Sequence, residues 1–421
     1  MQSQPQTGRT RFVRPVLFLG IASSAAMAQQ MPIRPLGATT AASKEVLGQV
    51  NGVRALSDGR VLVNDPLRRR LVLFDATLAT ATVVADSTPG SANSYARGGA
   101  AIISYAGDST LFVDVTSSSF LVIDGTGKIA RVMSAPRTQD VFYLIQPGLG
   151  APGIDNRNRL VYRGIARPAQ PPFIPGQAFV PPTPPDTAPI MRVDLATRKL
   201  DTAAWIKIPK LNMSVSFTPA NVLVVSSIVN PLSMVDDWAL LSDGSIAILR
   251  ARDYHIDWVY PDGEKPSSAK ITYDWQRLAD EDKIAIVDST KRAIDSVAKF
   301  RRDSIAAANA GARVAPPPPG APGTTQNITD VVSPSELPDY MPPFRPGTSR
   351  ADRDGNLWVL ITRAKTSEGG PVYDVINRRG ELIDRVQLPV GRLIAGFGRE
   401  GAVFLTARDG AGVRLERARV R

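Results

Sequence analysis

The sequence predicts an all-β protein: a six-bladed β-propeller with a helical and proline-rich insertion between blades 4 and 5. Three observations predict it. Six short polar turns each lead into an apolar run, a second apolar run follows each of these, and a more polar strand then follows in the clearest units. Four-stranded units repeated at a long period are typical of a radial array of small antiparallel sheets.

The turns that begin the units carry Asp-Gly and similar pairs, which supply the positive φ that a tight hairpin needs. The clearest turns lie at residues 57–60, 242–245 and 352–356, and the weaker ones at 107–110, 156–159 and 399–401. We expect Gly59, Gly244 and Gly355 to lie between the first and second strands of their units with positive φ.

The sixth unit ends early. Residues 412–421 can form its third strand, and nothing remains for a fourth. Residues 44–50, which precede the first unit, are the natural donor of that strand. Their pairing with residues 413–420 would close the array and remove an exposed sheet edge. The predicted propeller therefore spans residues 44–421.

The first 28 residues predict a secretory signal peptide. Arg9, Arg11 and Arg14 precede an apolar stretch at 16–21, and Ala26-Met27-Ala28 provides a cleavage site of the small-x-small type. A buried N-terminal strand is the alternative. With export, the protein would be periplasmic or extracellular. No further segment is apolar enough to span a membrane, and the chain has no Cys, so disulfides are excluded.

The chain is basic, with 50 Lys and Arg against 39 Asp and Glu and a net charge of +11. Such a balance is also seen in nucleic-acid-binding proteins. Export and the scattering of the arginines through turns argue against nucleic acid. We therefore predict a protein or an acidic small molecule or polymer as the partner, and the sequence does not predict the oligomeric state.

The long insertions share one end of the predicted sheets. Loops between second and third strands, and connections between units, open on what we call the long-loop face; the other turns open on the short-turn face. The insertions at 86–99, 168–189, 205–235, 275–344 and 365–370 all belong to the long-loop face. Within 275–346, apolar residues at three- and four-residue spacing predict a helix over 275–310, and a proline-rich tether follows. The helix is predicted as a lid, a dimer contact, a membrane-surface helix or a surface-packed element. Long loops on a rigid scaffold favour binding, so we place the site at this face.

Seven residues are candidates for binding at that face. Arginine suits bidentate contact with carboxylate or phosphate, with a solvated rim as the alternative. The only histidine excludes a His-rich zinc site. The candidates are Arg69, Arg97, Asp237, Arg252, Tyr254, His255 and Arg350.

No catalytic or metal-ligating residue is assigned. Asp237 is predicted near the start of an innermost strand, where a carboxylate can bind a divalent metal, but no partner ligands align with it. The pattern Asp352, Asp354 and Asn356 resembles the start of a calcium loop, yet hairpin turn chemistry accounts for it. No cofactor is predicted, and a divalent metal is left open.

Residues 352–359 read Asp-Arg-Asp-Gly-Asn-Leu-Trp-Val. This hairpin resembles the blade motif of six-bladed propellers of the NHL-repeat and TolB-like kind, and the resemblance extends over residues 44–421. The resemblance implies the fold but no single activity, because such proteins include binding modules, lactonases and lyases. From it we predict an exported, non-enzymatic binding or scaffolding propeller with its partner at the long-loop face. The alternative is a metal-dependent hydrolase or lactonase-type propeller with an axial site.

Overall fold

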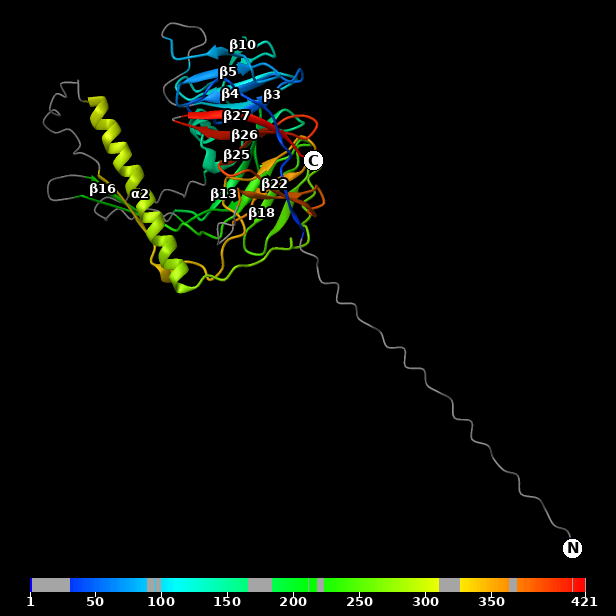
Figure 1. Cartoon of the computed structure of the whole chain (residues 1–421), viewed down its shortest axis with the longest axis vertical. Coiled ribbons are helices and arrows are strands. Elements are labelled where there is room, and N and C mark those ends of the chain that lie inside the picture. The colour runs from blue at the N-terminus through cyan, green and yellow to red at the C-terminus, as the bar shows by residue number, and fades with distance from the viewer. Residues whose placement is uncertain are drawn as a thin grey trace. The chain divides into compact units, whose positions relative to one another are not determined.

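The computed structural model of the chain describes Met1 and residues 31–88, 95, 100–165, 184–210, 212–217, 223–309, 326–362, 369–410 and 412–420. The predicted signal peptide thus lies outside the described residues except for Met1. Most of the regular secondary structure of the described part is β-strand, arranged in seven sheets (Figure 1). No helix in these ranges combines the length and apolar character needed to cross a bilayer.

Six of the seven sheets have a core of strands that follow one another in the chain and pair antiparallel, and two of these six each add one strand from the N-terminal segment. The first sheet contains β3 (Val53–Ala55), β4 (Val61–Asp65), β5 (Arg70–Phe74) and β6 (Ala81–Ala85), and the second contains β7 (Ala100–Ser104), β8 (Thr110–Asp114), β9 (Ser119–Ile123) and β10 (Ile129–Ser134). The third contains β11 (Gly153–Ile154), β12 (Arg159–Arg163), β13 (Thr187–Asp194) and β14 (Leu200–Lys207), and the fourth contains β17 (Asp237–Leu240), β18 (Ile246–Arg250) and β19 (His255–Val259). The fifth contains β21 (Arg350–Ala351), β22 (Leu357–Leu360), β23 (Val372–Ile376) and β24 (Leu382–Gln387), and the sixth contains β25 (Arg392–Phe397), β26 (Ala402–Asp409) and β27 (Gly412–Arg419). Short helices η1 (Thr138–Asp140), α1 (Val141–Leu144) and η2 (Pro147–Leu149) connect the second of these sheets to the third.

The burial of the strands follows their order within each sheet. The second strand β4 is buried at every position, whereas the fourth strand β10 is exposed or half-buried throughout. Strands that are apolar on both faces need a neighbour on each side. The turn prediction is confirmed, because Gly59, Gly244 and Gly355 have φ of 87°, 88° and 84° between the first and second strands.

Apolar clusters join each of the six sheets to the next. Phe112 on β8 packs with Leu62 and Leu71 of the preceding sheet, for example. Equivalent clusters lie between the second and third, third and fourth, fourth and fifth, and fifth and sixth sheets. A final cluster brings Phe404 of the last sheet against Val63 of the first. The packing therefore returns from the last sheet to the first.

The N-terminal segment pairs with the C-terminal sheet, but not where the sequence predicts. Strand β2 (Thr39–Ala42) runs antiparallel to β27, and of the predicted segment only Leu47 forms a bridge, to Val413. The reason lies in Asp65, whose carboxylate accepts the backbone N–H groups of Gly48 and Gln49 at 3.0 Å each and holds them on the first sheet. A further strand, β1 (Ile33–Pro35), runs parallel to β24.

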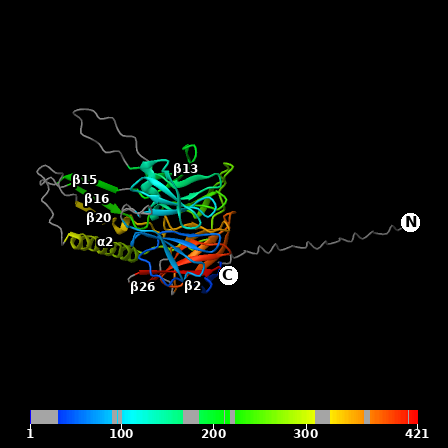
Figure 2. The same ribbon diagram turned by 90° about the horizontal axis from the view of Figure 1, so that it is seen from above.

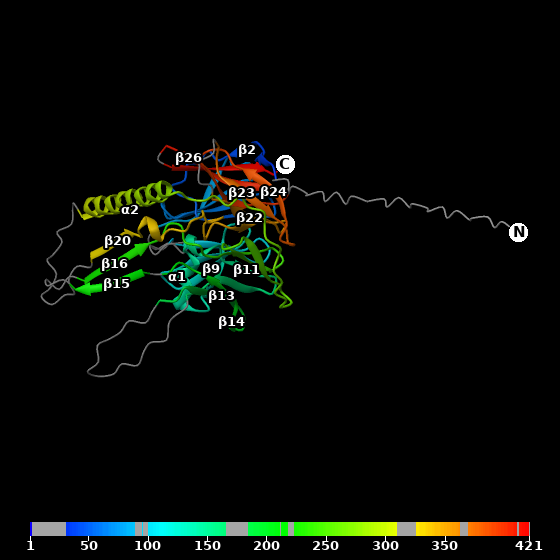
Figure 3. The ribbon, with the colours of Figure 1, turned by 90° about the horizontal axis from the view of Figure 1, so that it is seen from below.

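The seventh sheet and the long helix form a separate element. The predicted helix is α2 (Asp280–Asn309), five residues shorter at its start than expected. Strands β15 (Asn212–Phe217) and β16 (Leu223–Val229) belong to one insertion, and β20 (Gln326–Val331), parallel to β16, belongs to the other. Figures 2 and 3 show α2 beside these strands.

The apolar stripe of α2 packs on this sheet rather than on the six others. Val287 is buried with Val331 and Val332, and with Leu337, just beyond the short helix η3 (Pro334–Glu336). Further along the helix, Val297 is 68% exposed. The insertions at 205–235 and 275–344, which the sequence predicts as separate loops, thus fold together as one α/β unit.

Candidate functional site

A buried carboxylate lies where the second insertion returns to the sheets. Asp237 is the first residue of β17, and it is only 2% exposed. Its two carboxylate oxygens accept the backbone N–H groups of Gly347 at 2.9 Å and Ser349 at 3.0 Å. These hydrogen bonds fix the chain that enters β21. Asp237 therefore lies at the long-loop face, at the junction of two neighbouring sheets.

Two arginines are close to this carboxylate. Arg350 begins β21, and its Nη1 donates to the carbonyl oxygens of Gly347 at 2.9 Å and Ser349 at 2.8 Å. Arg163 ends β12, and its buried Nε has no hydrogen-bond partner among the described residues. Burial lowers the pKa of both arginines, and the charge of Asp237 opposes that shift. One carboxylate and two guanidinium groups thus come from the same ends of three consecutive sheets.

Burial also raises the pKa of the Asp237 carboxyl, while hydrogen bonds from Ser349 and Gly347 act in the opposite direction. Removing an ionised carboxylate from water is costly, so the protonated form gains relative stability. A carboxyl group that binds its proton more tightly than a solvated Asp is suited to general acid and base chemistry.

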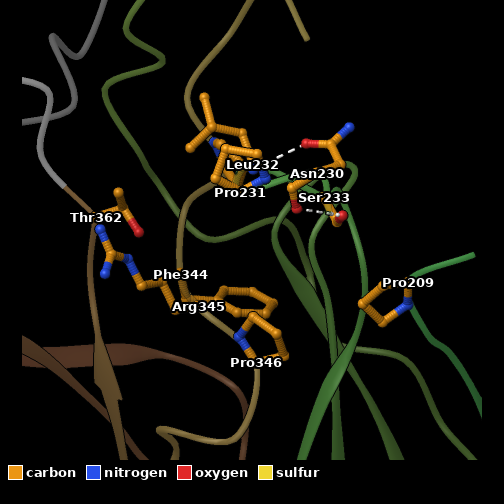
Figure 4. A pocket seen from close by; sticks show the side chains of 10 residues that line it. Pro209, Asn230, Pro231, Leu232, Ser233, Phe344, Arg345, Pro346 and Thr362 are labelled. Carbon is orange, nitrogen blue, oxygen red and sulfur yellow. Dashed lines mark hydrogen bonds between the residues drawn. The ribbon is translucent and has the colours of Figure 1, made fainter. Parts of the chain in front are cut away.

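A cavity of about 90 Å³ adjoins the same loop (Figure 4). Pro346, which lines it, directly precedes the Gly347 that binds Asp237. Four prolines and Leu232 are half of its ten lining residues, and Figure 4 shows the side chain of Arg345 directed toward Thr362. Its lining residues are Pro209, Asn230, Pro231, Leu232, Ser233, Pro342, Phe344, Arg345, Pro346 and Thr362. This volume holds a small chemical group rather than a large ligand.

Of the predicted site residues, the structure brings Asp237 and Arg350 together. Arg69 lies in the β4–β5 turn at the same face, where its Nη2 donates to the carbonyl of Tyr95 at 2.9 Å. Arg252 is exposed in the β18–β19 turn. Arg97 lies outside the described residues.

Tyr254, the last residue of that turn, and His255, the first residue of β19, make contacts within the protein. Tyr254 is completely buried, and its hydroxyl donates to Asp374 at 3.0 Å on the neighbouring sheet. The His255 ring lies between two carboxylates, with Nδ1 2.7 Å from Asp253 and Nε2 3.3 Å from Asp257. The side chain of Tyr254 therefore packs between two sheets and is not exposed at the long-loop face, where the sequence places it as a binding residue.

Sequence reasoning missed Arg163. A signal for it existed, since Arg163 ends an apolar run immediately before the proline-rich loop, the same position relative to the long-loop face as the residues that were chosen.

The residues around Asp237 do not fit a divalent metal. Hard cations such as Ca²⁺ and Mg²⁺ take several oxygen ligands, mainly carboxylates and carbonyls. Here one carboxylate faces two guanidinium groups, which repel a cation. Throughout the part of the chain that the structure describes, no three His, Cys, Asp or Glu side chains are grouped to hold a metal.

Comparison with known protein families finds no match, and neither does comparison with curated proteins. Solved structures of β-propeller proteins are similar to the chain. A calcium-binding regucalcin from Agrobacterium tumefaciens is 11% identical over 92% of this chain and 98% of its own, with a TM-score of 0.40. Virginiamycin B lyase from Staphylococcus aureus is 9% identical over 90% and 98%, with a TM-score of 0.37. A putative gluconolactonase is 12% identical over 92% and 95%, with a TM-score of 0.39.

These comparisons correct the predicted function. A non-enzymatic binding or scaffolding protein was expected, whereas several of the similar structures are named as a lyase, a luciferin-regenerating enzyme and a putative gluconolactonase. At such identities and TM-scores the likeness concerns the fold, so the chemistry must come from this chain's own residues.

Proposed function

We propose that this chain is a hydrolase of the lactonase or esterase type whose reacting groups are Asp237, Arg163 and Arg350. The observation that carries the proposal is the buried carboxylate of Asp237, which has a raised pKa and lies close to the guanidinium groups of Arg163 and Arg350. Because this donor set does not fit a divalent cation, the proposal departs from a metal-dependent mechanism and uses the side chains alone.

In the proposed reaction, ionised Asp237 takes a proton from water as the water oxygen bonds to the carbonyl carbon of an ester or lactone. The carbonyl oxygen becomes an anion, which Arg163 and Arg350 stabilise, as fixed donors do for developing charge. The intermediate then collapses with cleavage of the carbon–oxygen bond. The departing alkoxide receives the proton from Asp237, which returns to its starting state.

The proposal requires movement of residues 345–349. Asp237 is nearly inaccessible in this structure, and Gly347, whose N–H it binds, directly follows Pro346 of the cavity wall. Opening of this loop would bring a small acyl group held in the cavity to the carboxylate. Active-site loops with this gating role are common in enzymes.

We also propose that the six sequential sheets are the six blades of a propeller related to the NHL-repeat and TolB-like kind. The clusters that join consecutive sheets and return from the last to the first support a ring. The proposed site would then lie near the axis at the long-loop face. Export by the predicted 1–28 signal, with a substrate carrying an acidic group, completes the proposal.

The test is hydrolysis of a panel of simple lactones and aryl esters by the purified protein. Asp237→Asn should lower kcat by about 100-fold or more, the scale of a lost general base. Arg408→Gln is the matched control, because it removes an exposed charge from the end of β26 at the same face, and activity should persist in EDTA. Absence of turnover on every substrate, or full activity in Asp237→Asn, would refute the proposal.

A further inference from the structure

A second group of arginines lies at the opposite ends of the sheets, on the short-turn face. Arg54, in the innermost strand β3, is 5% exposed. Its Nη2 donates to the carbonyl of Gly107 at 2.7 Å, and its Nη1 donates to that of Ala55 at 3.3 Å. Its Nε is buried and has no hydrogen-bond partner among the described residues. One donor of a buried cation is thus left for another acceptor.

Two further guanidinium groups approach Arg54 from other sheets. The Nη2 of Arg353, in the turn before β22, donates to the same carbonyl oxygen of Ala55 at 3.2 Å. Arg399 lies in the turn before β26, and its charge acts on both other arginines. Burial, and then the like charge of Arg353, lower the pKa of Arg54 to about 10. The turns therefore gather cations that repel one another.

One carboxylate, Asp108, opposes this charge. Its oxygens also accept hydrogen bonds from the backbone N–H of Ser57, at 2.9 Å, and from the Ser57 hydroxyl. Three guanidinium groups against a single carboxylate leave excess positive charge. The Arg399 side chain is exposed and has no hydrogen bond or ion pair with any residue that the structure describes, so its donors are available to a ligand.

A cavity of about 270 Å³ opens beside Arg353, between the fifth and sixth sheets. Trp358, Phe397 and Gly398 form part of its wall. Two of its acidic residues are already bound within the protein, since Asp384 pairs with Arg34 and Asp352 accepts the indole N–H of Trp358 at 3.0 Å. A third, Asp354, is exposed. The cavity can hold the body of a small molecule whose anionic group meets the arginines.

We propose that Arg54, Arg353 and Arg399 form a binding site for a compact oxyanion, the phosphate or carboxylate group of a small molecule. Arginine donors in a fixed planar fork match the oxygens of either group. The site lies on the face opposite the proposed hydrolase site and does not depend on it. Because the arginines come from three different sheets, a bound anion would link those sheets and stabilise the folded state.

Titration calorimetry with inorganic phosphate and with malonate tests the proposal. Binding of one or both probes is expected, and their ranking distinguishes a phosphate from a carboxylate ligand. Arg353→Gln and Arg399→Gln should each weaken binding by about tenfold or more, the scale of a charge-assisted hydrogen bond. Both residues are exposed, so these variants should remain folded, which circular dichroism checks.

Arg379→Gln is the matched control, since it removes an exposed charge from the β23–β24 turn on the same face, where the Arg379 side chain pairs with Glu381. Its affinity for the probes should equal that of the wild type. Failure of both probes to bind at about 10 mM would overturn the proposal. Equal weakening by the Arg379 and Arg353 variants would do so too, because net charge alone would then explain binding.

Discussion

The carboxylate of Asp237 accepts the backbone N–H of Ser349 at 3.0 Å, although 112 residues separate them. Between them lies the whole helical insertion. The bond, together with that from Gly347, fixes the point at which the insertion ends and the next sheet begins. The same carboxylate is the group proposed to react, so the reacting position and the boundary of the insertion depend on one side chain.

Asp237→Asn should alter the dependence of stability on pH. The raised pKa of Asp237 means that the folded state binds this proton more tightly than the unfolded state, where the value is 3.8. This contribution to stability is fully present below 3.8 and is lost as the pH rises through the folded-state value. We therefore expect the free energy of unfolding of the variant, relative to wild type, to increase as the pH rises, measured by urea denaturation.

Asp75→Asn provides a control of opposite sign. Hydrogen bonds from Thr80 and Thr77 lower the pKa of the half-buried Asp75. Wild-type Asp75 thus contributes stability above 3.8 that is lost at lower pH, and the variant should lose relative stability as the pH rises. Parallel trends in the two variants would contradict the assignment of a raised pKa to Asp237.

Substitution of Gly244 by Ala should cost more stability than the same change at Gly107. Both glycines have positive φ, 88° and 59°, so each alanine costs about 1 kcal/mol or more of backbone strain. At Gly244 the added Cβ would also meet Oδ1 of Asn156 at 2.8 Å, whereas nothing lies within 4 Å at Gly107. Urea denaturation compares the two variants, and equal losses of unfolding free energy would show that the contact with Asn156 costs no stability.

Removal of residues 2–42 should destabilise the protein, whereas removal of 2–30 should not. The longer truncation removes β1 and β2 and exposes the edge of β27, where Thr39 is opposite Ala418. Exposed edges also promote association between chains. Thermal unfolding and size-exclusion chromatography measure both effects. An unchanged melting temperature in the longer truncation would show that β2 contributes nothing to closure.

Local sequence signals predicted the sheets because their causes are local. A turn at Gly59 or Gly355 needs positive φ, and the residues that supply it are adjacent in the chain. The seventh sheet lacks such signals. Its strands β16 and β20 pair in parallel across about a hundred residues, as the contact between Ser227 and Ile328 shows, and no turn connects them. Only the folded chain brings them together.

The candidate site, like the sheets, was predictable only where its cause is local in the sequence. Asp237 and Arg350 begin innermost strands, so strand order alone placed both at the long-loop face. The burial of Tyr254 depends instead on Asp374, 120 residues away on the next sheet, and no local pattern encodes that partner. The short-turn arginines were missed for a similar reason, since Arg54 and Arg353 meet only through the carbonyl of Ala55.

Val287→Ala should loosen the insertion without unfolding the six sequential sheets. Val287 is 4% exposed and packs with Val331 and Leu337, so its truncation should cost roughly 2 kcal/mol within this unit. Val297→Ala, at a position 68% exposed on the same helix, is the matched control and should cost little. Hydrogen exchange separates local opening from global unfolding.

Amides of α2 and β20 should exchange faster in Val287→Ala, while those of β17–β19 keep the wild-type rate. This outcome is expected because the apolar cluster around Val287 contains no residue of those three strands. Faster exchange in β17–β19 as well would mean that the insertion supports the body of the protein. It would then have to be treated as part of the fold that positions Asp237, rather than as a unit that opens beside it.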